Sequence, residues 1–390
     1  MKARIGWQGL TTKEYLESGE YILITGTDFS NGKINWSGCF FVEKKRYLQD
    51  TNIQIRSGDI LITKDGTIGK IAYIEDVPLP TTLNSGVFVV RKINDKYFSK
   101  YLYYVFTSNF FISFLNKLKA GSTINHLYQK DFVTFNLLLP SIKEQKRIAR
   151  MLSDVDTLIN ELNVLINKKE LLKKGLMQEL LTGKKRLSGY ENTKWRREKL
   201  GKFIYLQGGF AFKSNNFQKK GTPIIRISDI DSGTINLEDV VYYPLNFHLS
   251  KDFIINKNDS LIAMSGATTG KVGIYNSDSI AYQNQRVGKF VLKDKNMDKK
   301  YIHKIISSDL FKRNLFKELE QGAQPNISAK QIEGLIFDFS MDRREQEEIA
   351  NILFSVDGEI NDLVSKRNKY ELIKKGLMQE LLTGRLRVKL

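Results

Sequence analysis

One glycine-bounded turn in the chain has residue types that could hold a phosphate. Residues 266–271 read Gly-Ala-Thr-Thr-Gly-Lys, and residues 66–70, Gly-Thr-Ile-Gly-Lys, take the corresponding place in the first half of the chain. A nucleotide-binding P-loop requires four residues between its glycines and a Ser or Thr after the lysine, which holds magnesium. Here only three and two residues lie between the glycines, and Val272 and Ile71 follow the lysines. The spacing argues against a P-loop. It leaves a tight turn whose lysine and backbone N–H groups can hold a DNA phosphate.

Other catalytic chemistry is not indicated by the motifs. His126, His248 and His303 are not at metal-ligand spacing, and Cys39 is the single cysteine, which cannot build a zinc site. The chain has no G-x-S-x-G motif for a serine nucleophile. No two of its six prolines are adjacent, which excludes the Asn/Asp-Pro-Pro-Tyr/Phe loop of amino-methyltransferases. The carboxylate pair at 347–348 is expected on a solvated helix surface. We therefore predict a non-catalytic chain without a metal site.

Polar clusters suited to base readout remain. Residues 282–286, Tyr-Gln-Asn-Gln-Arg, offer amides that pair with adenine and a guanidinium that pairs with guanine. Residues 122–130 form the corresponding cluster of the first half, loosely matched by 324–330, and 208–214 add an aromatic and basic edge. Each cluster taken alone could equally be a solvated polar loop. The candidate DNA-binding residues are Lys64, Thr67, Lys70, Asn84, Ser122, Thr123, Asn125, His126, Tyr128, Gln129, Lys130, Phe210, Phe212, Lys213, Ser265, Thr268, Thr269, Lys271, Tyr282, Gln283, Asn284, Gln285, Arg286, Gln324, Asn326 and Lys330.

The elements that must position these loops occur twice. The sequence KKGLMQELLTG at 173–183 recurs unchanged at 374–384, an offset of 201 positions, and Asp156 answers Asp357 at the same offset. A period this long indicates domain duplication and not a solenoid of short repeats. Each half has a divergent part of about 140 residues followed by a closely repeated stretch. Divergent globular modules joined by repeated segments suggest that the two modules recognise different targets while sharing one structural framework.

The repeated stretches are predicted to be long helices. Their apolar residues step by four and three, the heptad seam of a coiled coil. Pro140 marks the expected start of the first helix, and Gly183 and Gly384 suit the C-terminal caps. Each helix then spans about 40 residues, or roughly 60 Å. The predicted seam and partner-contact residues are Ile148, Leu152, Val155, Ile159, Leu162, Ile166, Leu176, Leu180, Ile349, Leu353, Val356, Ile360, Leu363, Leu377 and Leu381.

Two details of these helices carry further expectations. Gly175 and Gly376 lie inside the pattern, where a glycine costs about 1 kcal/mol relative to alanine. We expect local bending or a close helix contact there. The leucine-rich ends, at 176–181 and 377–382, leave more apolar surface than a two-helix seam covers, so they are expected to contact a partner protein. The alternatives are that these ends cap the bundle on its own globular domains, and that both helices are core helices of one globule.

The globular halves are rich in short strands. Residues 21–24, 59–62 and 87–90 are apolar, β-branched and bounded by Gly, Asn or Asp, and 224–227, 260–263 and 289–292 repeat them. A more helical segment follows each set, at 100–118 and 300–319. These patterns predict an α+β class with two pseudo-repeated globular modules. The polar, basic residues 184–194 read as the linker into the second copy.

Composition restricts the partner. The chain has 61 Lys plus Arg against 43 Asp plus Glu, a formal net charge of +18 and a pI near 9.6. Such an excess favours a polyanion, either nucleic acid or an anionic membrane face. No apolar run approaches the roughly 20 residues that span a bilayer, and residues 1–10 show no signal-peptide core, so we expect no membrane association. The single cysteine fits a reducing cytoplasm.

Taken together, these motifs resemble the specificity (S) subunits of type I restriction–modification systems. The resemblance covers nearly the whole chain and is carried by LITKDGTIGK (61–70), LNSGVF (83–88), GSTINHLYQKDF (121–132), EQKRIARML (144–152) with EQEEIANIL (345–353), and the doubled GLMQELLTG. It implies two target-recognition domains joined by two long antiparallel coiled-coil helices. Each domain would read one half of a bipartite, asymmetric DNA site with an unread gap between the halves.

The resemblance also implies boundaries and partners. The first target-recognition domain is expected at 1–141, the first spacer helix at 142–184, the linker at 185–194, the second domain at 195–341, and the second helix with its tail at 342–390. Modification subunits would supply S-adenosylmethionine-dependent adenine methylation, and a restriction subunit would supply ATP- and magnesium-dependent cleavage, so this chain itself carries no cofactor. The alternative is a helical adaptor or scaffold protein whose basic charge is incidental.

One departure from the family pattern concerns the start of the first module. The second module opens with residues 195–201, Trp-Arg-Arg-Glu-Lys-Leu-Gly, and the first has no room for an equivalent. Either the native N-terminus is longer, or this edge is completed by the C-terminal residues 385–390.

Overall fold

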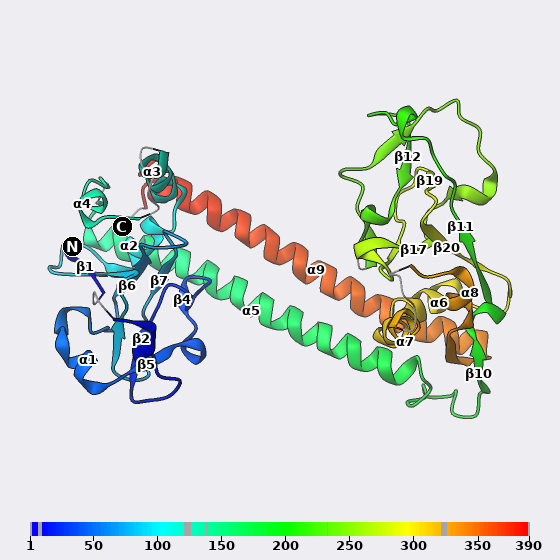
Figure 1. Ribbon diagram of the computed structural model, residues 1–390, viewed down its shortest axis with the longest axis horizontal. Coiled ribbons are helices and arrows are strands. Elements are labelled where there is room, and N and C mark those ends of the chain that lie inside the picture. The colour runs from blue at the N-terminus through cyan, green and yellow to red at the C-terminus, as the bar shows by residue number, and fades with distance from the viewer. Residues whose placement is uncertain are drawn as a thin grey trace. The chain divides into compact units, whose positions relative to one another are not determined.

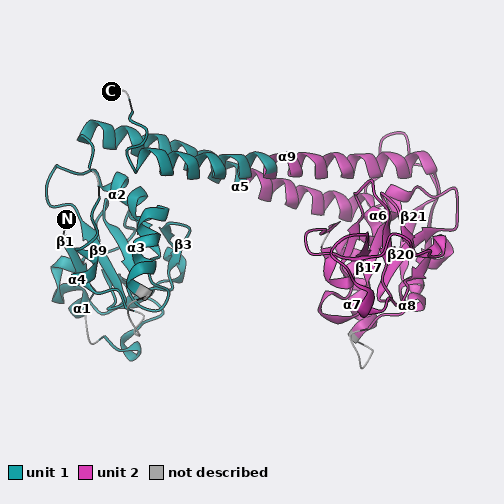
Figure 2. Ribbon diagram, turned by 90° about the horizontal axis from the view of Figure 1, so that it is seen from above, with its two compact units in different colours: residues 1–163, 365–390 teal, residues 164–364 magenta. Residues whose placement is uncertain are grey.

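The computed structural model describes residues 2–6, 10–120, 126–137, 139–231, 233–320 and 326–388. The chain forms two compact units (Figure 2). Unit 1 comprises residues 1–163 and 365–390, and unit 2 comprises residues 164–364. Each unit therefore contains one globular domain and parts of both repeated helices. None of the helices in the described parts of the chain combines the length and apolar character that a bilayer crossing demands.

Unit 1 is built around a four-stranded antiparallel sheet in the order β1-β9-β6-β7. Strands β1, β6 and β7 of this sheet are labelled in Figure 1. Its central strand β6 is buried along its whole length, with Ile60 and Ile62 in one apolar core and Leu61 in another. Successive side chains of a strand point to opposite faces, so a continuous apolar run marks a strand covered on both sides. The strands of this sheet are β1 (Lys2–Ile5), β6 (Ile60–Thr63), β7 (Ile71–Tyr73) and β9 (Val87–Arg91).

A smaller sheet covers one face of the first, and helices cover the other. The smaller sheet has the order β5-β2-β8, with β2 parallel to β8 and antiparallel to β5. On the opposite face, Tyr101 and Phe111 pack in one core with Ile148 and Leu152 of the long helix. The remaining elements are β2 (Tyr21–Ile24), β3 (Phe29–Ser30), β4 (Lys33–Ile34), β5 (Phe40–Val42), β8 (Thr81–Leu83), α1 (Lys44–Gln49), α2 (Ser99–Phe106), α3 (Asn109–Ala120) and α4 (Gln129–Phe132).

Unit 2 has the same two-sheet arrangement, with more strands in each sheet. A six-stranded sheet has the order β11-β20-β17-β18-β14-β13, and a four-stranded sheet has the order β15-β12-β19-β16. Leu261 and Ile262 of β17 again point into different cores. The strands are β11 (Ile204–Gly208), β12 (Thr222–Ile225), β13 (Ile230–Asp231), β14 (Gly233–Ile235), β15 (Val241–Tyr243), β16 (Ile254–Ile255), β17 (Ser260–Ala263), β18 (Val272–Ile274), β19 (Ala281–Gln283) and β20 (Val287–Leu292). The helices are α6 (Lys299–Ile306), α7 (Asp309–Glu320) and α8 (Ala329–Gly334).

The helical segment after each sheet is two helices and not one. The predicted segments 100–118 and 300–319 break at Ser108 and Ser308, whose hydroxyls each donate to a carbonyl three residues earlier at 2.6 Å. A serine hydroxyl that binds the local backbone competes with helix continuation. Short 3-10 turns complete the chain at Thr12–Glu14, Trp36–Gly38, Thr51–Ile53, Leu200–Lys202, Ser214–Asn216, Ile227–Asp229, Lys251–Phe253 and Gly266–Thr268.

The repeated stretches form α5 (Ile142–Leu180) and α9 (Arg343–Leu381), each 39 residues long. In unit 1, Asp156 of α5 pairs with Lys374 of α9 at 2.6 Å. In unit 2, Lys169 pairs with Glu359 and Lys173 with Asp357, each at 2.5 Å. As the position along α5 advances from 169 to 173, the position along α9 falls from 359 to 357. The two helices therefore run antiparallel, as predicted.

The predicted seam is buried at its ends, whereas between them Ile166 is buried and Ile159 is half-buried. Ile148, Leu152, Ile349 and Leu353 are buried against the globular domains, whereas Leu162 is only half-buried between the helices. Gly183 and Gly384 have φ of 67° and 74°, the left-handed conformation of a C-terminal cap. Of the local bending or close helix contact expected at Gly175 and Gly376, the close contact is wrong, because a Cβ there would have no atom of another segment within 4 Å. The bending stays a prediction.

The leucine-rich helix ends are largely covered by the globular domains of the same chain. Leu180 and Leu181 are buried in the core of unit 2, and Leu176 and Met177 pack against it. The repeated residues do the same in unit 1, where Leu381 and Leu382 are buried and Leu377 and Met378 pack beside them. The predicted partner contacts at Leu180 and Leu381 are therefore wrong, whereas Leu176 and Leu377 are half-buried and their partner contacts stay predictions. This apolar surface caps each helix on a globular domain of its own chain.

Unit 2 has an edge strand that the described part of unit 1 does not repeat. β10 (Trp195–Lys199) pairs antiparallel with β21 (Ile336–Ser340), and Leu200 N–H donates to Leu335 O at 2.8 Å. In unit 1, C-terminal residues do lie on the domain: Arg387 binds Glu144, and Val388 packs against the core. Arg387 thereby takes the place that Arg186 of the linker holds in unit 2, where it binds Glu345.

Candidate nucleic-acid interface

Three loops of unit 1 are tied together through the backbone of Lys64, the residue after strand β6. Its N–H donates to Gly86 O at 2.9 Å, in the turn between β8 and β9. Its carbonyl accepts from Leu127 N–H at 3.0 Å, in the segment that leads to α4. The turn between β6 and β7 is thus fixed beside two loops that are distant in sequence. The candidate residues of these three loops lie in one region of the domain.

The turn between β6 and β7 has a defined internal geometry. The Thr63 hydroxyl donates to Thr67 O at 2.5 Å and accepts from Lys70 N–H at 2.9 Å. Gly66 and Gly69 adopt φ of 65° and 86°, a left-handed conformation that glycine adopts without strain. A Cβ at Gly69 would lie 2.5 Å from Leu115, so that glycine also lets the turn approach α3. Thr67 is exposed at the tip, and Lys70 is half-buried at its end.

Asp65 is a charged residue of this turn that the sequence reasoning did not select. Its carboxylate accepts from Lys64 Nζ at 2.9 Å and also contacts His126 Nδ1. Beside it, Tyr128 and Lys130 are exposed, and Lys130 Nζ lies 5.5 Å from the centre of the Tyr128 ring. Gln129 is likewise exposed. The signal available in the sequence was that an acidic residue stands at the centre of an otherwise basic turn.

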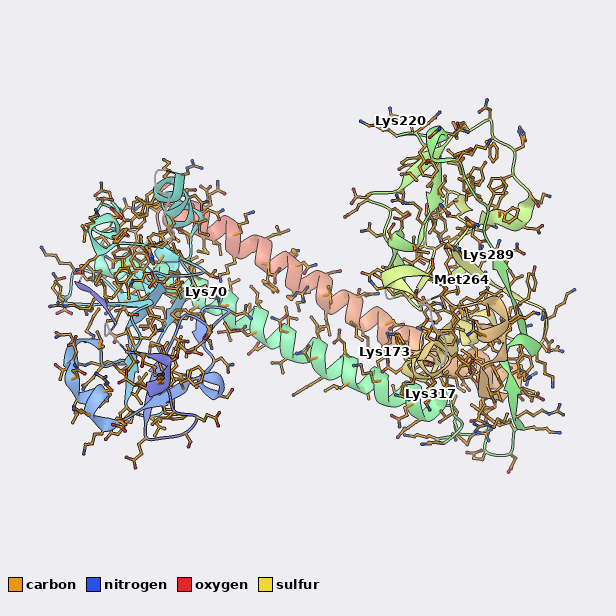
Figure 3. The ribbon with its side chains drawn as sticks, viewed as in Figure 1. Lys70, Lys173, Lys220, Met264, Lys289 and Lys317 are labelled. Atoms are coloured by element: carbon orange, nitrogen blue, oxygen red, sulfur yellow. The ribbon has the colours of Figure 1, made fainter. Side chains whose placement is uncertain are left out.

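Unit 2 repeats this convergence around Met264, which is labelled in Figure 3. Met264 N–H donates to Arg286 O at 3.0 Å, and Met264 O accepts from Ile327 N–H at 3.0 Å. The turn between β17 and β18 is therefore held beside the β19–β20 turn and the segment entering α8. Backbone geometry is repeated while the side chains differ, because residues 64 and 264 are lysine and methionine.

Several candidate DNA-binding residues of the turn between β17 and β18 make contacts within the protein. Ser265 is buried, and the Thr268 hydroxyl donates to Ile227 O at 3.0 Å. The Thr269 hydroxyl donates to Gly266 O at 2.6 Å, and Lys271 Nζ lies 3.2 Å from Asp231 Oδ1. These residues shape the turn. Their polar atoms are less available to a ligand than the sequence suggests.

The cluster 282–286 divides into a buried and an exposed part. Gln283 has 0% of its surface exposed, and its side-chain amide donates to Gln207 O at 2.7 Å and Val287 O at 2.8 Å. Tyr282 is buried and donates to Phe247 O at 2.8 Å. Both belong to strand β19, so assigning them to base readout is inconsistent with this structure. Asn284, which is half-buried, and the exposed Gln285 and Arg286 form the turn beyond the strand and remain candidates.

The aromatic edge at 208–214 is mostly internal. The Phe212 ring stacks on Tyr282 with centroids 5.8 Å apart, and Phe210 packs edge-on to Phe212 at 5.0 Å. Rings occupied by other rings are poor platforms for an incoming base. Lys213 beside them is exposed. In unit 1, Asn84 is also structural, because its Oδ1 accepts from Gly86 N–H at 3.0 Å.

The remaining candidates are placed as follows. Asn326 is exposed in the segment before α8, and Lys330 is exposed in the first turn of that helix. Lys330 lines a surface groove with Arg197, Lys199 and Lys202, three basic residues that the sequence reasoning did not select. The groove also contains Glu198 and Glu333. The predicted residues Ser122, Thr123, Asn125 and Gln324 lie outside the described residues.

The buried titratable groups Cys39 and His303 contact other residues of the chain and have shifted pKa values. Burial, with the negative charge of Asp28, raises the pKa of the Cys39 thiol to about 12, which keeps it protonated and unreactive. Burial, with the positive charge of Lys304, lowers the pKa of His303 to about 4, and its ring contacts the hydroxyls of Ser260 and Ser307. Across the described ranges, no group of three or more His, Cys, Asp or Glu residues is arranged to hold a metal ion. The converging loops can bind a ligand through polar and basic side chains.

The sequence and the fold of this chain are similar to those of known proteins. The model of the type I restriction modification DNA specificity domain matches residues 8–173 and again residues 192–372. A type I restriction enzyme MjaVIII specificity subunit of Methanocaldococcus jannaschii is 29% identical over 360 residues, covering 88% of this chain and 83% of the relative. The EcoKI specificity subunit of Escherichia coli is 25% identical over 254 residues, covering 60% and 53%. The crystal structure of a type I S subunit from M. genitalium has a TM-score of 0.61 at 14% identity, over 98% of this chain and 93% of that chain.

Proposed function

The chain belongs to the type I restriction–modification DNA specificity family, and from that premise we propose that each of its two globular domains reads one half of a bipartite, asymmetric DNA site. The observation that carries this proposal is the convergence of three loops on Lys64 in unit 1 and on Met264 in unit 2. Because the backbone arrangement is equivalent and the side chains differ, each domain can recognise its own DNA half-site independently of the other. The domains at 1–141 and 195–341 are the proposed target-recognition domains.

The two loop sets offer different chemistry to DNA. In unit 1 the exposed groups include Thr67, Tyr128, Lys130 and His126, and His126 contacts the Asp65 carboxylate. In unit 2 they include Gln285 and Arg286. Arginine pairs bidentately with guanine and glutamine with adenine, whereas a carboxylate accepts from cytosine N4. The half-sites read by the two domains should therefore differ.

The chain itself is proposed to be non-catalytic. Modification subunits would bring S-adenosylmethionine and methylate adenine, and restriction subunits would bring ATP and magnesium and cut the DNA. Relatives named as specificity subunits of type I restriction enzymes support this division of labour. The proposed site of action is the cytoplasm, where double-stranded DNA and these partners meet.

Methyl transfer tests this division. The purified chain with labelled S-adenosylmethionine and DNA should transfer no methyl group, and addition of a modification subunit should produce sequence-specific adenine methylation. Methylation by the chain alone would contradict the proposal.

DNA binding separates this function from the adaptor alternative. A DNA-specificity chain should bind DNA with an affinity that falls steeply with salt concentration, because bound phosphates release counterions. It should also prefer one duplex sequence over others at fixed salt. An adaptor with incidental basic charge would bind all sequences equally, and its salt dependence would not change when the loop residues are substituted.

A further inference from the structure

A three-residue polar bridge joins the recognition domain of unit 2 to both long helices. Asp357 of α9 stands at its centre. One of its carboxylate oxygens pairs with Lys173 Nζ of α5 at 2.5 Å, and the other pairs with Lys304 Nζ of α6 in the recognition domain. Lys173 is labelled on α5 in Figure 3. A single carboxylate thus links three elements within the unit.

The Lys304 end of this bridge is built into the protein. The Lys304 side chain is only 3% exposed, and its Nζ lies 3.6 Å from the centre of the Phe354 ring. Such a position over an aromatic face is the geometry of a cation–π interaction. Burial disfavours the Asp357 carboxylate, but hydrogen bonds from Lys173 and Lys304 outweigh it and lower its pKa. Burial lowers the pKa of the Lys304 ammonium, and the contact with Asp357 opposes that shift. The bridge is an ion pair whose ammonium is buried and whose carboxylate is 25% exposed.

Unit 1 has a bridge of the same geometry and different chemistry. Asp156 of α5 pairs with Lys374 of α9 at 2.6 Å and accepts from the Tyr104 hydroxyl of α2 at 2.9 Å. Asp156 and Asp357 are 201 positions apart, as are Lys173 and Lys374. Tyr104 is the sixth residue of the eight-residue helix α2, and Lys304 is the sixth residue of the eight-residue helix α6. A neutral hydroxyl therefore replaces a buried ammonium at the same place.

We propose that these bridges orient the recognition domains on the helix pair, with Tyr104 and Lys304 as the positioning residues. The inference rests on the proposed function and deepens it. Apolar contacts between a domain and a helix are non-directional, whereas a hydrogen bond weakens steeply as its angle departs from linear. A buried charge costs more than an apolar residue of the same volume, and its best-attested use is to fix one arrangement among several. The bridge sets the angle at which each domain meets its half-site.

The two anchors are not interchangeable. Phe354 lies under Lys304, and the residue at the corresponding place in unit 1 is Ser153, which lies beside Tyr104. A lysine in the first position would lose the aromatic ring beneath its ammonium. A tyrosine in the second position would meet the Phe354 ring in the space that the lysine side chain occupies. A recognition domain moved between the two positions must therefore exchange its anchor and the helix residue beneath it together.

The test uses the full chain assembled with its modification subunits and a DNA library in which the gap between the half-sites varies. Wild-type complex should methylate one gap length. Lys304→Met should lower the preference for that gap by at least about tenfold, because a small misplacement of the reacting groups costs rate steeply. Lys299→Met is the matched control, since Lys299 lies on the same helix but pairs with Asp259 of its own domain at 2.8 Å. It should keep the wild-type gap.

Two double variants separate orientation from stability. Lys304→Met with Asp357→Leu removes the buried ammonium together with its half-buried carboxylate partner and should regain thermal stability, yet it should keep the relaxed gap preference. Lys304→Tyr with Phe354→Ser installs the anchor of unit 1 and should restore the single gap, whereas Lys304→Tyr alone should not. The inference is overturned if Lys304→Met keeps the wild-type gap, if the apolar pair restores it, or if Lys304→Tyr alone does. A wild-type complex with no preferred gap would overturn the proposed function itself.

Discussion

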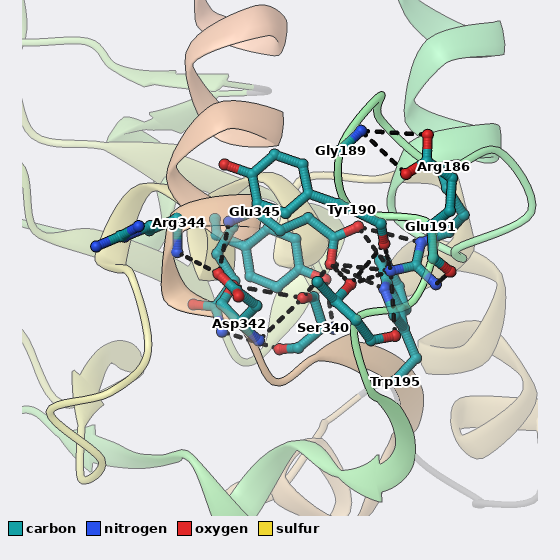
Figure 4. A network of polar contacts seen from close by, with 12 residues as sticks. Arg186, Gly189, Tyr190, Glu191, Trp195, Ser340, Asp342, Arg344 and Glu345 are labelled. Carbon is teal, nitrogen blue, oxygen red and sulfur yellow. Dashed lines mark hydrogen bonds and ion pairs between the residues drawn. The ribbon is translucent and has the colours of Figure 1, made fainter.

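Arg186 and Glu345 form an ion pair between the segment that follows the first long helix and the start of the second. Arg186 Nη2 lies 3.0 Å from Glu345 Oε1, and the Glu345 side chain has 0% of its surface exposed (Figure 4). The same carboxylate accepts from Trp195 Nε1 at 3.0 Å and from the Thr193 hydroxyl at 2.7 Å. The linker is therefore fixed to unit 2 at the point where the recognition domain begins.

The pair recurs in unit 1 with a different exposure. Arg387 Nη2 lies 2.7 Å from Glu144 Oε2, and Arg387 and Glu144 each lie 201 positions from their counterpart. The Arg387 side chain is 69% exposed, whereas that of Arg186 is 21% exposed. Arg186→Met should therefore destabilise the protein by roughly 3 kcal/mol, as expected when a buried carboxylate loses its charged partner. Arg387→Met should cost less, because solvent screens its exposed guanidinium. Chemical denaturation of both variants measures the difference, and equal losses would show that exposure does not control these pairs.

Base selectivity in unit 2 should reside in Gln285 and Arg286. Replacing both with alanine should relax the sequence preference at one half-site only, at roughly 1–3 kcal/mol per lost bidentate contact. Gln283→Ala is the matched control. It leaves Gln207 O and Val287 O without their donor, so it should lower the free energy of unfolding by about 1–3 kcal/mol. Binding to a panel of duplexes that vary one half-site at a time distinguishes these effects. Relaxation of both half-sites, or of neither, would show that this turn does not read bases.

Lys70 should contribute affinity without sequence preference. Lys70→Ala should weaken binding to all duplexes alike and lower the slope of log affinity against log salt by about one unit. Lys271→Ala should have a smaller effect, because Asp231 already lies 3.2 Å from its ammonium. Titrations at several salt concentrations measure both slopes. If Lys70→Ala lowered the affinity for some duplex sequences more than for others, Lys70 would contact bases and not phosphates.

Helix length should set the gap between the half-sites. One heptad inserted after Leu162 and one after Leu363 keep the seam in phase and lengthen each helix by about 10 Å. At about 3.4 Å per base pair, the gap should grow by roughly three base pairs with both half-sites unchanged. Weaker binding is expected as well, because the added twist costs on the order of a few kcal/mol. Methylation mapping of the variant reads the gap, and a folded variant that keeps the original gap would show that the helices are not the ruler.

The duplicated frame could be predicted from sequence because its signals are local and periodic. The heptad steps located α5 and α9 within a few residues, and the runs predicted at 21–24, 59–62 and 87–90 match strands β2, β6 and β9 to within one residue at each end. Side-chain availability could not be predicted in the same way. Gln283 has the residue type of a base reader, but it is buried because β11 and β20 supply carbonyls from elsewhere in the chain.

The prediction of partner contacts at the leucine-rich helix ends was wrong at Leu180 and Leu381 for a related reason. A helix pattern shows how much apolar surface is exposed by two helices, but not which distant segment covers it. Leu180 and Leu381 are covered by the globular domains of units 2 and 1, respectively. The bridges at Asp156 and Asp357 also depend on side chains distant in sequence. Their only sequence signal was an aspartate conserved in the internal repeat.

Genome-wide mapping of adenine methylation, in cells with and without this chain, tests most directly whether its two domains read one bipartite site. Cells that contain the chain and its modification subunits should carry a methylated motif of two unlike half-sites with a fixed gap, and that motif should vanish when the chain is removed. A motif that persists without the chain, or a single uninterrupted motif that depends on it, would contradict the account.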